Sequence, residues 1–192
     1  MKELKDMSLE ELWRLFPIVL REHNPEYKEW YDEEKSSIIR ALRSCIICRI
    51  NHIGSTSVAG LIAKPIVDIL LELPADYDVD AAAHLLQGNG WLIMQKDDAN
   101  KVIDFNKGYT SYGFAEKVFH LHVKPSGDWD ELYFRDYLRQ YPGAARRYEK
   151  LKLDLLRQFK HNRDAYTGAK SEFVTEITEE ARKEYGSRYS IC

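Results

Sequence analysis

The segment from residue 51 to residue 72 constrains the fold of this chain more than any other, because a glycine-serine turn joins two apolar stretches there. Residues 46–52 are β-branched and apolar, which predicts a buried strand. This strand ends at Gly54-Ser55, where glycine permits backbone conformations that other residues avoid. Lys64-Pro65 then favours extended geometry before a second apolar strand over 66–73. The pattern predicts two strands joined through a tight turn, and we expect the functional centre at that turn.

The turn itself predicts an anion site. Ser55 is a good helix N-cap, so we expect a short helix that begins there and ends near Gly60. Unpaired backbone N–H groups, together with the hydroxyls of Ser55 and Thr56, are expected to face outward at the positive end of this helix. Gly54, Ser55 and Thr56 are therefore candidate phosphate-binding residues.

Two carboxylates share one face of the second strand. Side chains alternate along a strand, so Asp68, Leu70 and Glu72 are expected on one face and the intervening apolar residues on the other. A carboxylate in an apolar strand needs a hydrogen-bond donor or a metal ion as its partner. Asp68 and Glu72 are therefore candidate metal ligands.

A pair of histidines lies on another predicted strand, over 118–123, where His120 and His122 share a face. If this is the face that carries Asp68, the two rings are candidate metal ligands or proton carriers. The alternative is that both histidines satisfy hydrogen bonds within the sheet, and the sequence favours neither interpretation.

Three basic residues on predicted C-terminal helices are further phosphate candidates. Arg135 and Arg139 lie one helical turn apart and are spaced to clamp a phosphate, although Arg135 equally suits a structural ion pair with Asp136. Lys152 is the third candidate, and for this residue a solvated helix lysine is the slightly favoured alternative.

The spacing from Gly54-Ser55 to Asp68 resembles the skeleton of the nucleotidyltransferase superfamily, in which the turn holds nucleotide phosphates and strand carboxylates hold divalent metal. The chain also resembles the GrpB family over about residues 17–185. This resemblance rests on four motifs: HIGSTSVAGLIAKPIVDI at 52–69, HLHV at 120–123, FRDYLR at 134–139 and YEKLK at 148–152. It implies a nucleotidyltransferase-like fold without a settled substrate. The superfamily expects a second carboxylate two residues after Asp68, and Leu70 occupies that position.

The resemblance implies a nucleotidyltransferase that uses a nucleoside triphosphate and an unknown acceptor. Mg²⁺ or Mn²⁺ at Asp68 would polarise the α-phosphate, while Gly54, Ser55 and Lys64 would hold the β and γ groups. Leu70 favours a different class, a nucleotide- or phosphate-binding module without transfer chemistry. A metal-dependent phosphohydrolase that uses the histidine pair is a third possibility.

Imidazole ligation shifts metal preference from Mg²⁺ toward Mn²⁺. Because Leu70 removes one expected bridging carboxylate, we expect a single ion rather than a metal pair. The sequence therefore predicts one Mn²⁺-preferring site at Asp68 and His122. Glu72 is a weaker candidate ligand because it lies one alternation beyond Leu70.

The remaining patterns predict an α/β domain with a mixed, mostly antiparallel sheet of about five strands. Helices are expected before, within and after the sheet, and those at the C-terminal end, over 129–140, 143–160 and 169–185, should form a cap beside the turn. A capping box at residues 8–11 predicts an N-terminal helix that stops at Pro17. We expect residues 1–16 to form an extension of one domain over 17–192. An edge strand over 18–22 is also expected.

Composition sets the remaining limits on function. The net charge is −3, and 44% hydrophobic with 31% charged residues is typical of a soluble globular protein. No apolar run is long enough to span a membrane and the N-terminal residues resemble no signal peptide, so a cytoplasmic protein is expected. No basic stripe suggests a nucleic-acid surface. Cys45 and Cys48 form a C-x-x-C pair, which we interpret as buried structural thiols rather than a zinc or redox site.

Overall fold

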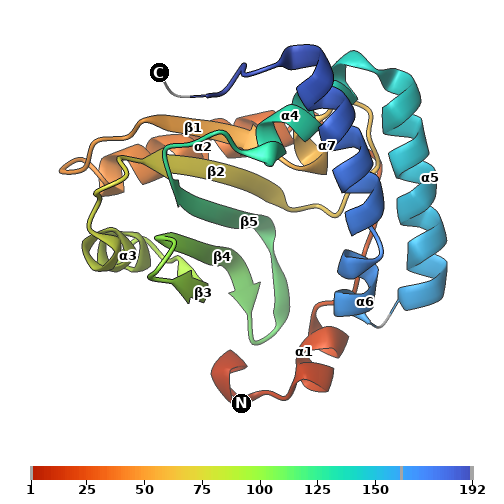
Figure 1. Cartoon of the computed structure of the whole chain (residues 1–192). Coiled ribbons are helices and arrows are strands. Elements are labelled where there is room, and N and C mark those ends of the chain that lie inside the picture. Colours follow the sequence, from red (N-terminus) through yellow and green to blue (C-terminus); the bar gives the residue numbers. More distant parts are fainter. Residues whose placement is uncertain (1, 161, 191–192) are drawn as a thin grey trace.

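The computed structural model describes residues 2–160 and 162–190, and its centre is a sheet (Figure 1). The strands are β1 (Arg49–Ile53), β2 (Val67–Leu73), β3 (Leu92–Asp97), β4 (Val102–Thr110) and β5 (Gly113–Pro125). Their spatial order is β1-β2-β5-β4-β3, with β2 and β5 parallel and the other neighbours antiparallel. The predicted mixed, mostly antiparallel sheet is confirmed.

Helices precede, interrupt and follow this sheet, as predicted. They are α1 (Leu9–Leu15), α2 (Tyr27–Ala41), α3 (Val79–Gln87), α4 (Asp130–Gln140), α5 (Pro142–Phe159), α6 (Arg163–Gly168) and α7 (Ser171–Tyr185). Two single 3₁₀ turns, η1 (Leu4–Asp6) and η2 (Ser55–Ser57), complete the elements. The capping box at the start of α1 is present, because Ser8 Oγ accepts from the Glu11 N–H and the Glu11 carboxylate accepts from the Ser8 N–H.

The two faces of the sheet pack against different helices, as the alternation along β2 predicts. Val67, Ile69 and Leu71 belong to the main core with residues of α2 and α3. On the opposite face, Leu70 is fully buried against Ile53 of β1 and Leu132 of α4. In Figure 1 the helices α4, α5, α6 and α7 gather on one side of β1, β2 and β5. These helices form the predicted C-terminal cap.

Several expected elements differ in the structure. The first strand begins only at Arg49, and Ile46 is exposed, so the predicted strand start at residue 46 is wrong. Cys48 is exposed and Cys45 half-buried, which overturns the prediction that both thiols are buried. The edge strand expected over 18–22 is reduced to one isolated bridge between Arg21 and Ala63. The helix α6 has only six residues, too few for a clear periodic pattern, and was not predicted.

No helix among residues 2–160 and 162–190 is both long and apolar enough to cross a bilayer.

Candidate functional site

A cavity of about 870 Å³ lies where the turn after β1 faces β2, β5 and the C-terminal helices. Its lining brings together eight of the residues that the sequence singled out: Gly54, Ser55, Thr56, Lys64, Asp68, His120, His122 and Lys152. Three other candidates, Glu72, Arg135 and Arg139, do not line it. The predicted phosphate turn, strand carboxylate and histidine pair therefore share one site.

Strand register brings the histidines to the face that carries Asp68. In the parallel β2-β5 pair, Asp68 lies opposite His120, and Leu70 lies opposite His122. The His120 ring nitrogen Nδ1 is 3.0 Å from Asp68 Oδ1, and its Nε2 is 2.8 Å from the Tyr109 hydroxyl oxygen. A neutral ring that donates from Nδ1 to the carboxylate and accepts at Nε2 from Tyr109 satisfies both contacts. His120 thus orients the Asp68 side chain.

The polar chain continues from Tyr109 to α6, because Arg163 Nη2 donates to the Tyr109 hydroxyl oxygen at 3.0 Å. Burial lowers the pKa of His120, which keeps its ring neutral. Burial alone would raise the pKa of Asp68, but the His120 hydrogen bond and nearby positive charge outweigh it, so this pKa lies below its ordinary value. Asp68 is therefore a fixed carboxylate at neutral pH.

His122 is held by a different carboxylate. Its Nδ1 is 2.7 Å from Asp104 Oδ1 on β4, the residue directly opposite it in the antiparallel β4-β5 pair. Burial disfavours the charged ring, but the Asp104 hydrogen bond and the negative charges of Asp68, Asp104 and Glu131 together outweigh burial and raise the pKa of His122. Among the described residues Nε2 of His122 has no hydrogen-bond partner. A histidine whose Nδ1 is fixed by a carboxylate presents Nε2 in the manner of an oriented metal ligand.

Gly54 is required by its conformation and by its contact with Asp68. Its φ is +68°, and a Cβ at this position would lie 2.2 Å from Asp68 Oδ2. The predicted helix from Ser55 to Gly60 is wrong, since only the 3₁₀ turn η2 forms before Val58 adopts an extended conformation. So short a turn has little macrodipole, and anion binding must depend on individual N–H groups and on nearby side-chain charge.

The two hydroxyls of the turn have different surroundings. Thr56 is 2% exposed, and its hydroxyl donates to the Ile66 carbonyl at 3.0 Å and contacts His52 Nε2 at 3.0 Å. The prediction that this hydroxyl faces outward is therefore wrong. Ser55 Oγ instead accepts from Lys152 Nζ at 3.2 Å. The turn is tied directly to α5 through this contact.

Lys152 is 3% exposed, which overturns the slightly favoured interpretation of a solvated helix lysine. Its ammonium also donates to the Ile62 carbonyl and lies 4.6 Å from the centroid of the Tyr148 ring. Burial, with nearby positive charge, lowers the pKa of Lys152 to about 7. Such a buried amine gains most from an anionic ligand, because an anion favours its charged form.

Three more cations complete the positive end of the cavity: Lys64, Arg163 and Lys170. Lys64 and Lys170 lie 5.8 Å and 4.7 Å from the centroid of the Tyr166 ring. Burial lowers the pKa of Lys64 to about 8 and also lowers that of Lys170. Arg163 was missed in the sequence because it belongs to the unpredicted α6, and Lys170, at the start of a predicted helix, carried no local signal that it faces a cavity. Together with Lys152 these residues concentrate positive charge near the turn.

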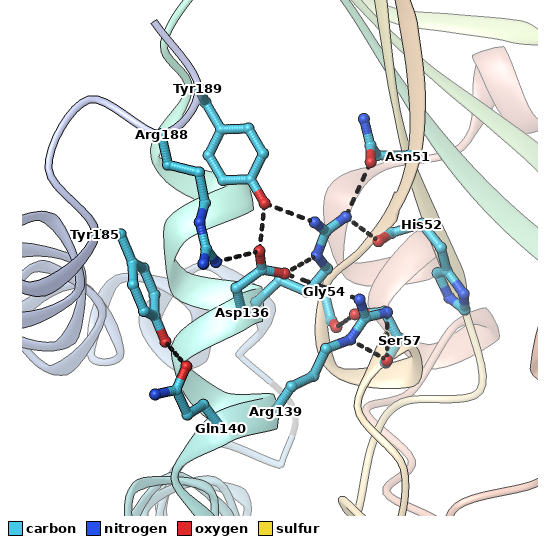
Figure 2. A network of polar contacts seen from close by, with 11 residues as sticks. Asn51, His52, Gly54, Ser57, Asp136, Arg139, Gln140, Tyr185, Arg188 and Tyr189 are labelled. Atoms are coloured by element: carbon cyan, nitrogen blue, oxygen red, sulfur yellow. Dashed lines mark hydrogen bonds and ion pairs between the residues drawn. The ribbon is translucent and has the colours of Figure 1, made fainter.

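Arg135 and Arg139 support the turn and do not line the cavity. Figure 2 shows Arg139 pointing toward Ser57. Arg135 is 7% exposed and donates to Asn51 Oδ1 at 3.1 Å and to the His52 carbonyl at 3.2 Å. Arg139 donates to the Ser57 carbonyl from Nε at 3.0 Å and from Nη2 at 2.9 Å. The two guanidinium groups thus hold the backbone before and after Gly54 by hydrogen bonds. This corrects the prediction that Arg135 and Arg139 clamp a phosphate.

Glu72 is also outside the cavity. It is fully buried, and its carboxylate accepts from Arg49 Nη2 at 2.7 Å and from the Gly127 N–H at 3.1 Å. An ion pair with Arg49 satisfies the need for a partner that the sequence indicated. This corrects the prediction that Glu72 is a weaker metal ligand.

Within the described part of the chain, no three His, Cys, Asp or Glu side chains come together to hold a metal ion by themselves. Asp68 and His122 remain as two possible ligands in one cavity. A metal ion at this site therefore requires additional ligands from a bound molecule or from water.

Comparison with known proteins agrees with the motif resemblance. The family model described as GrpB protein matches residues 17–180. A glutamate-rich protein GrpB from Alkalihalophilus pseudofirmus is 31% identical over 167 residues, which cover 85% of this chain and 95% of that protein. A UPF0157 protein from Pseudomonas aeruginosa is 40% identical over 129 residues, which are 67% of this chain but only about half, 53%, of that protein's length.

Among solved structures, the crystal structure of the conserved protein GrpB from Enterococcus faecalis superposes with a TM-score of 0.74 at 27% identity, covering 87% of this chain and 99% of that one. The family model alone matches most of the chain. This chain therefore belongs to the GrpB family.

Proposed function

We propose that the cavity binds a nucleoside triphosphate together with one divalent cation and transfers the nucleotidyl group to an acceptor. One observation carries the proposal: Lys64, Lys152, Arg163 and Lys170 line one cavity together with the glycine-serine turn and with the fixed carboxylate of Asp68. The negative charge of a polyphosphate requires cationic partners, and a metal-assisted transfer requires a carboxylate that holds the metal ion.

The positive end suits the β and γ phosphates. Lys152 is buried, Lys64 and Lys170 are half-buried, and burial lowers the pKa of all three, so an anion that enters favours their charged forms. The Ser55 and Thr56 N–H groups donate to no backbone carbonyl within the described residues and are available to phosphate oxygens. Gly54 lets the Asp68 carboxylate lie close to the turn.

We expect a metal ion to bind at this site only when a nucleotide is also bound. Asp68 and His122 supply at most two ligands, and phosphate oxygens supply others, as in the many sites where a cation is held by one or two carboxylates and the substrate. A cation held by Asp68 and His122 would supply positive charge that neutralises the phosphates and polarises the α-phosphate. With an imidazole ligand the proposed site favours Mn²⁺ over Mg²⁺.

In the transfer step an acceptor oxygen forms a bond to the α-phosphorus, and the bond from that phosphorus to the bridging oxygen of the β-phosphate breaks. Pyrophosphate leaves with the bridging oxygen, and the acceptor's proton passes to solvent. Asp68, oriented by His120, holds the negative charge that positions the cation beside the α-phosphate. Leu70 is fully buried, so no second strand carboxylate contributes, and the proposal involves one cation rather than a pair.

The second candidate is a nucleotide-binding module without transfer, and the buried Leu70 favours it. Incubation with nucleoside triphosphates labelled at the α-phosphate, with Mn²⁺ and a mixture of small hydroxyl and amine acceptors, tests the first candidate. Labelled adduct and pyrophosphate, lost in Asp68→Asn, would support transfer. Tight binding without pyrophosphate would support the module, and released orthophosphate would support a phosphohydrolase.

A further inference from the structure

The helix α7 lines the cavity from one end to the other with a single stripe of side chains. Lys170, Val174, Thr178 and Arg182 follow one another at intervals of four residues, and all four line the cavity. Twelve residues of helix span about 18 Å. Lys170 lies at the positive end, whereas Arg182 pairs with Asp128 and Asp130 at the start of α4. The cavity is therefore longer than its phosphate-binding end requires.

Two hydroxyls in the lining are buried without a partner in the described structure. Tyr166 is 0% exposed and Thr178 is 5% exposed, and neither hydroxyl oxygen has a hydrogen-bond partner. A helical threonine ordinarily bonds the carbonyl three or four residues before it, and Thr178 does not. A buried hydroxyl left unpaired is costly, so each of these groups is suited to a ligand in the cavity.

The two hydroxyls mark different chemical environments. Tyr166 lies between Lys64 and Lys170, which places its hydroxyl at the phosphate end. Thr178 lies two helical turns farther along α7, about 12 Å from Lys170. Its neighbours in the cavity wall include Val174 one turn before it and Phe134 of α4. This second environment combines an apolar wall with one unpaired hydroxyl, and the ion pairs of Arg182 close it one turn beyond Thr178.

We propose that the part of the cavity between α4 and α7 binds the nucleobase, with the Thr178 hydroxyl bonded to a polar atom on its edge. This rests on the proposed binding of a nucleoside triphosphate. A nucleobase has flat apolar faces and a hydrogen-bonding edge, which matches a wall of Phe134 and Val174 around one unpaired hydroxyl. The distance between Thr178 and Lys170 along α7 leaves room for the triphosphate chain between the base and the lysines.

The substitution Thr178→Val tests this assignment because it removes the hydroxyl and keeps the side-chain shape. Calorimetry with Mn²⁺ and each of the four common ribonucleoside triphosphates should show at least one binding about tenfold more weakly to the variant, since a buried hydrogen bond is lost. Inorganic tripolyphosphate, which has no base, should bind both proteins within twofold. Thr178→Ser should retain the affinity of the original protein.

A second readout separates a ligand contact from a structural role. Because the hydroxyl is unpaired in the empty protein, Thr178→Val should raise Tm by about 2–4 °C while weakening nucleotide binding. The matched control Thr175→Val changes an exposed threonine of the same helix and should leave binding unchanged.

Each other outcome overturns the assignment in a distinguishable way. Unchanged nucleotide affinity in Thr178→Val, or an equal loss for nucleotide and tripolyphosphate, would remove the base subsite while the proposed phosphate site stands. If the original protein bound tripolyphosphate but no nucleotide, the base subsite and nucleotide specificity would both fail. If it bound neither, the proposed function itself would fail.

Discussion

Lys152 makes binding of a polyphosphate depend on pH in a direction that can be worked out. Burial lowers the pKa of Lys152 to about 7 from its ordinary value of 10.5. Between these two pH values the unfolded chain keeps a proton that the folded protein has lost, so the empty protein gains stability as pH rises through this window. A bound phosphate reverses the shift, because its negative charge favours the ammonium.

The number of protons taken up follows from these values. At pH 8 a group with a pKa of about 7 is charged in only about one molecule in ten, so full recharging takes up about 0.9 proton. Lys64, with a pKa lowered to about 8, adds about half a proton. Above pH 7, affinity for tripolyphosphate should fall by up to about tenfold for each pH unit as Lys152 alone loses its charge.

Calorimetric titration with tripolyphosphate at pH 8, in two buffers of different ionisation enthalpy, measures this uptake directly. The Lys152→Met variant should take up about 0.9 proton less than the original protein, which cancels any contribution from the ligand itself. Lys150→Met, an exposed lysine of the same helix, should behave as the original protein does. Equal proton uptake in the original protein and Lys152→Met would refute the reasoning.

Three further predictions concern the turn, the metal and the support behind them. Gly54→Ala should abolish nucleotide binding and destabilise the fold by about 1–3 kcal/mol, because the new Cβ meets the Asp68 carboxylate and φ is +68°; chemical denaturation and calorimetry measure both. His122→Ala should weaken Mn²⁺ binding in the presence of nucleotide, and unchanged Mn²⁺ affinity in the variant would exclude a nitrogen ligand. In the original protein Mn²⁺ binding should weaken as pH falls through the pKa of His122, which lies above the ordinary histidine value. Tyr189→Phe removes a hydroxyl that contacts Arg135 and should cost about 1 kcal/mol in urea unfolding, and no loss would show that this contact is dispensable.

The parts of the site that depend on short-range pattern were predictable from the sequence. Glycine before Ser55 indicated a special backbone conformation, and strand alternation placed Asp68 on the cap side and Ile69 in the main core. Both inferences need only a few neighbouring residues. The register of β2 against β5, which brings His120 to Asp68, depends on a pairing that the sequence left open.

The charged residues were assigned less well because their roles depend on tertiary contacts. Arg139 looked like a phosphate ligand, but its guanidinium meets the Ser57 carbonyl, and no local pattern distinguishes an anion from a carbonyl oxygen. Lys152 looked solvated because a lysine on a helix usually is, and only the tertiary structure brings its ammonium to the Tyr148 ring, Ser55 and the Ile62 carbonyl. Arg163 lines the cavity from α6, an element too short to recognise.

The bond from Arg49 to the Tyr189 carbonyl, at 3.1 Å, joins residues 140 positions apart in the chain. At about 5–20 residues per second of synthesis, β1 exists for about 7–28 s before its distant partner is made. During that interval Arg135 also lacks the Tyr189 hydroxyl that it contacts in the finished protein. We therefore expect the nascent chain to form its sheet first and to acquire a firmly held Gly54 turn only late in translation.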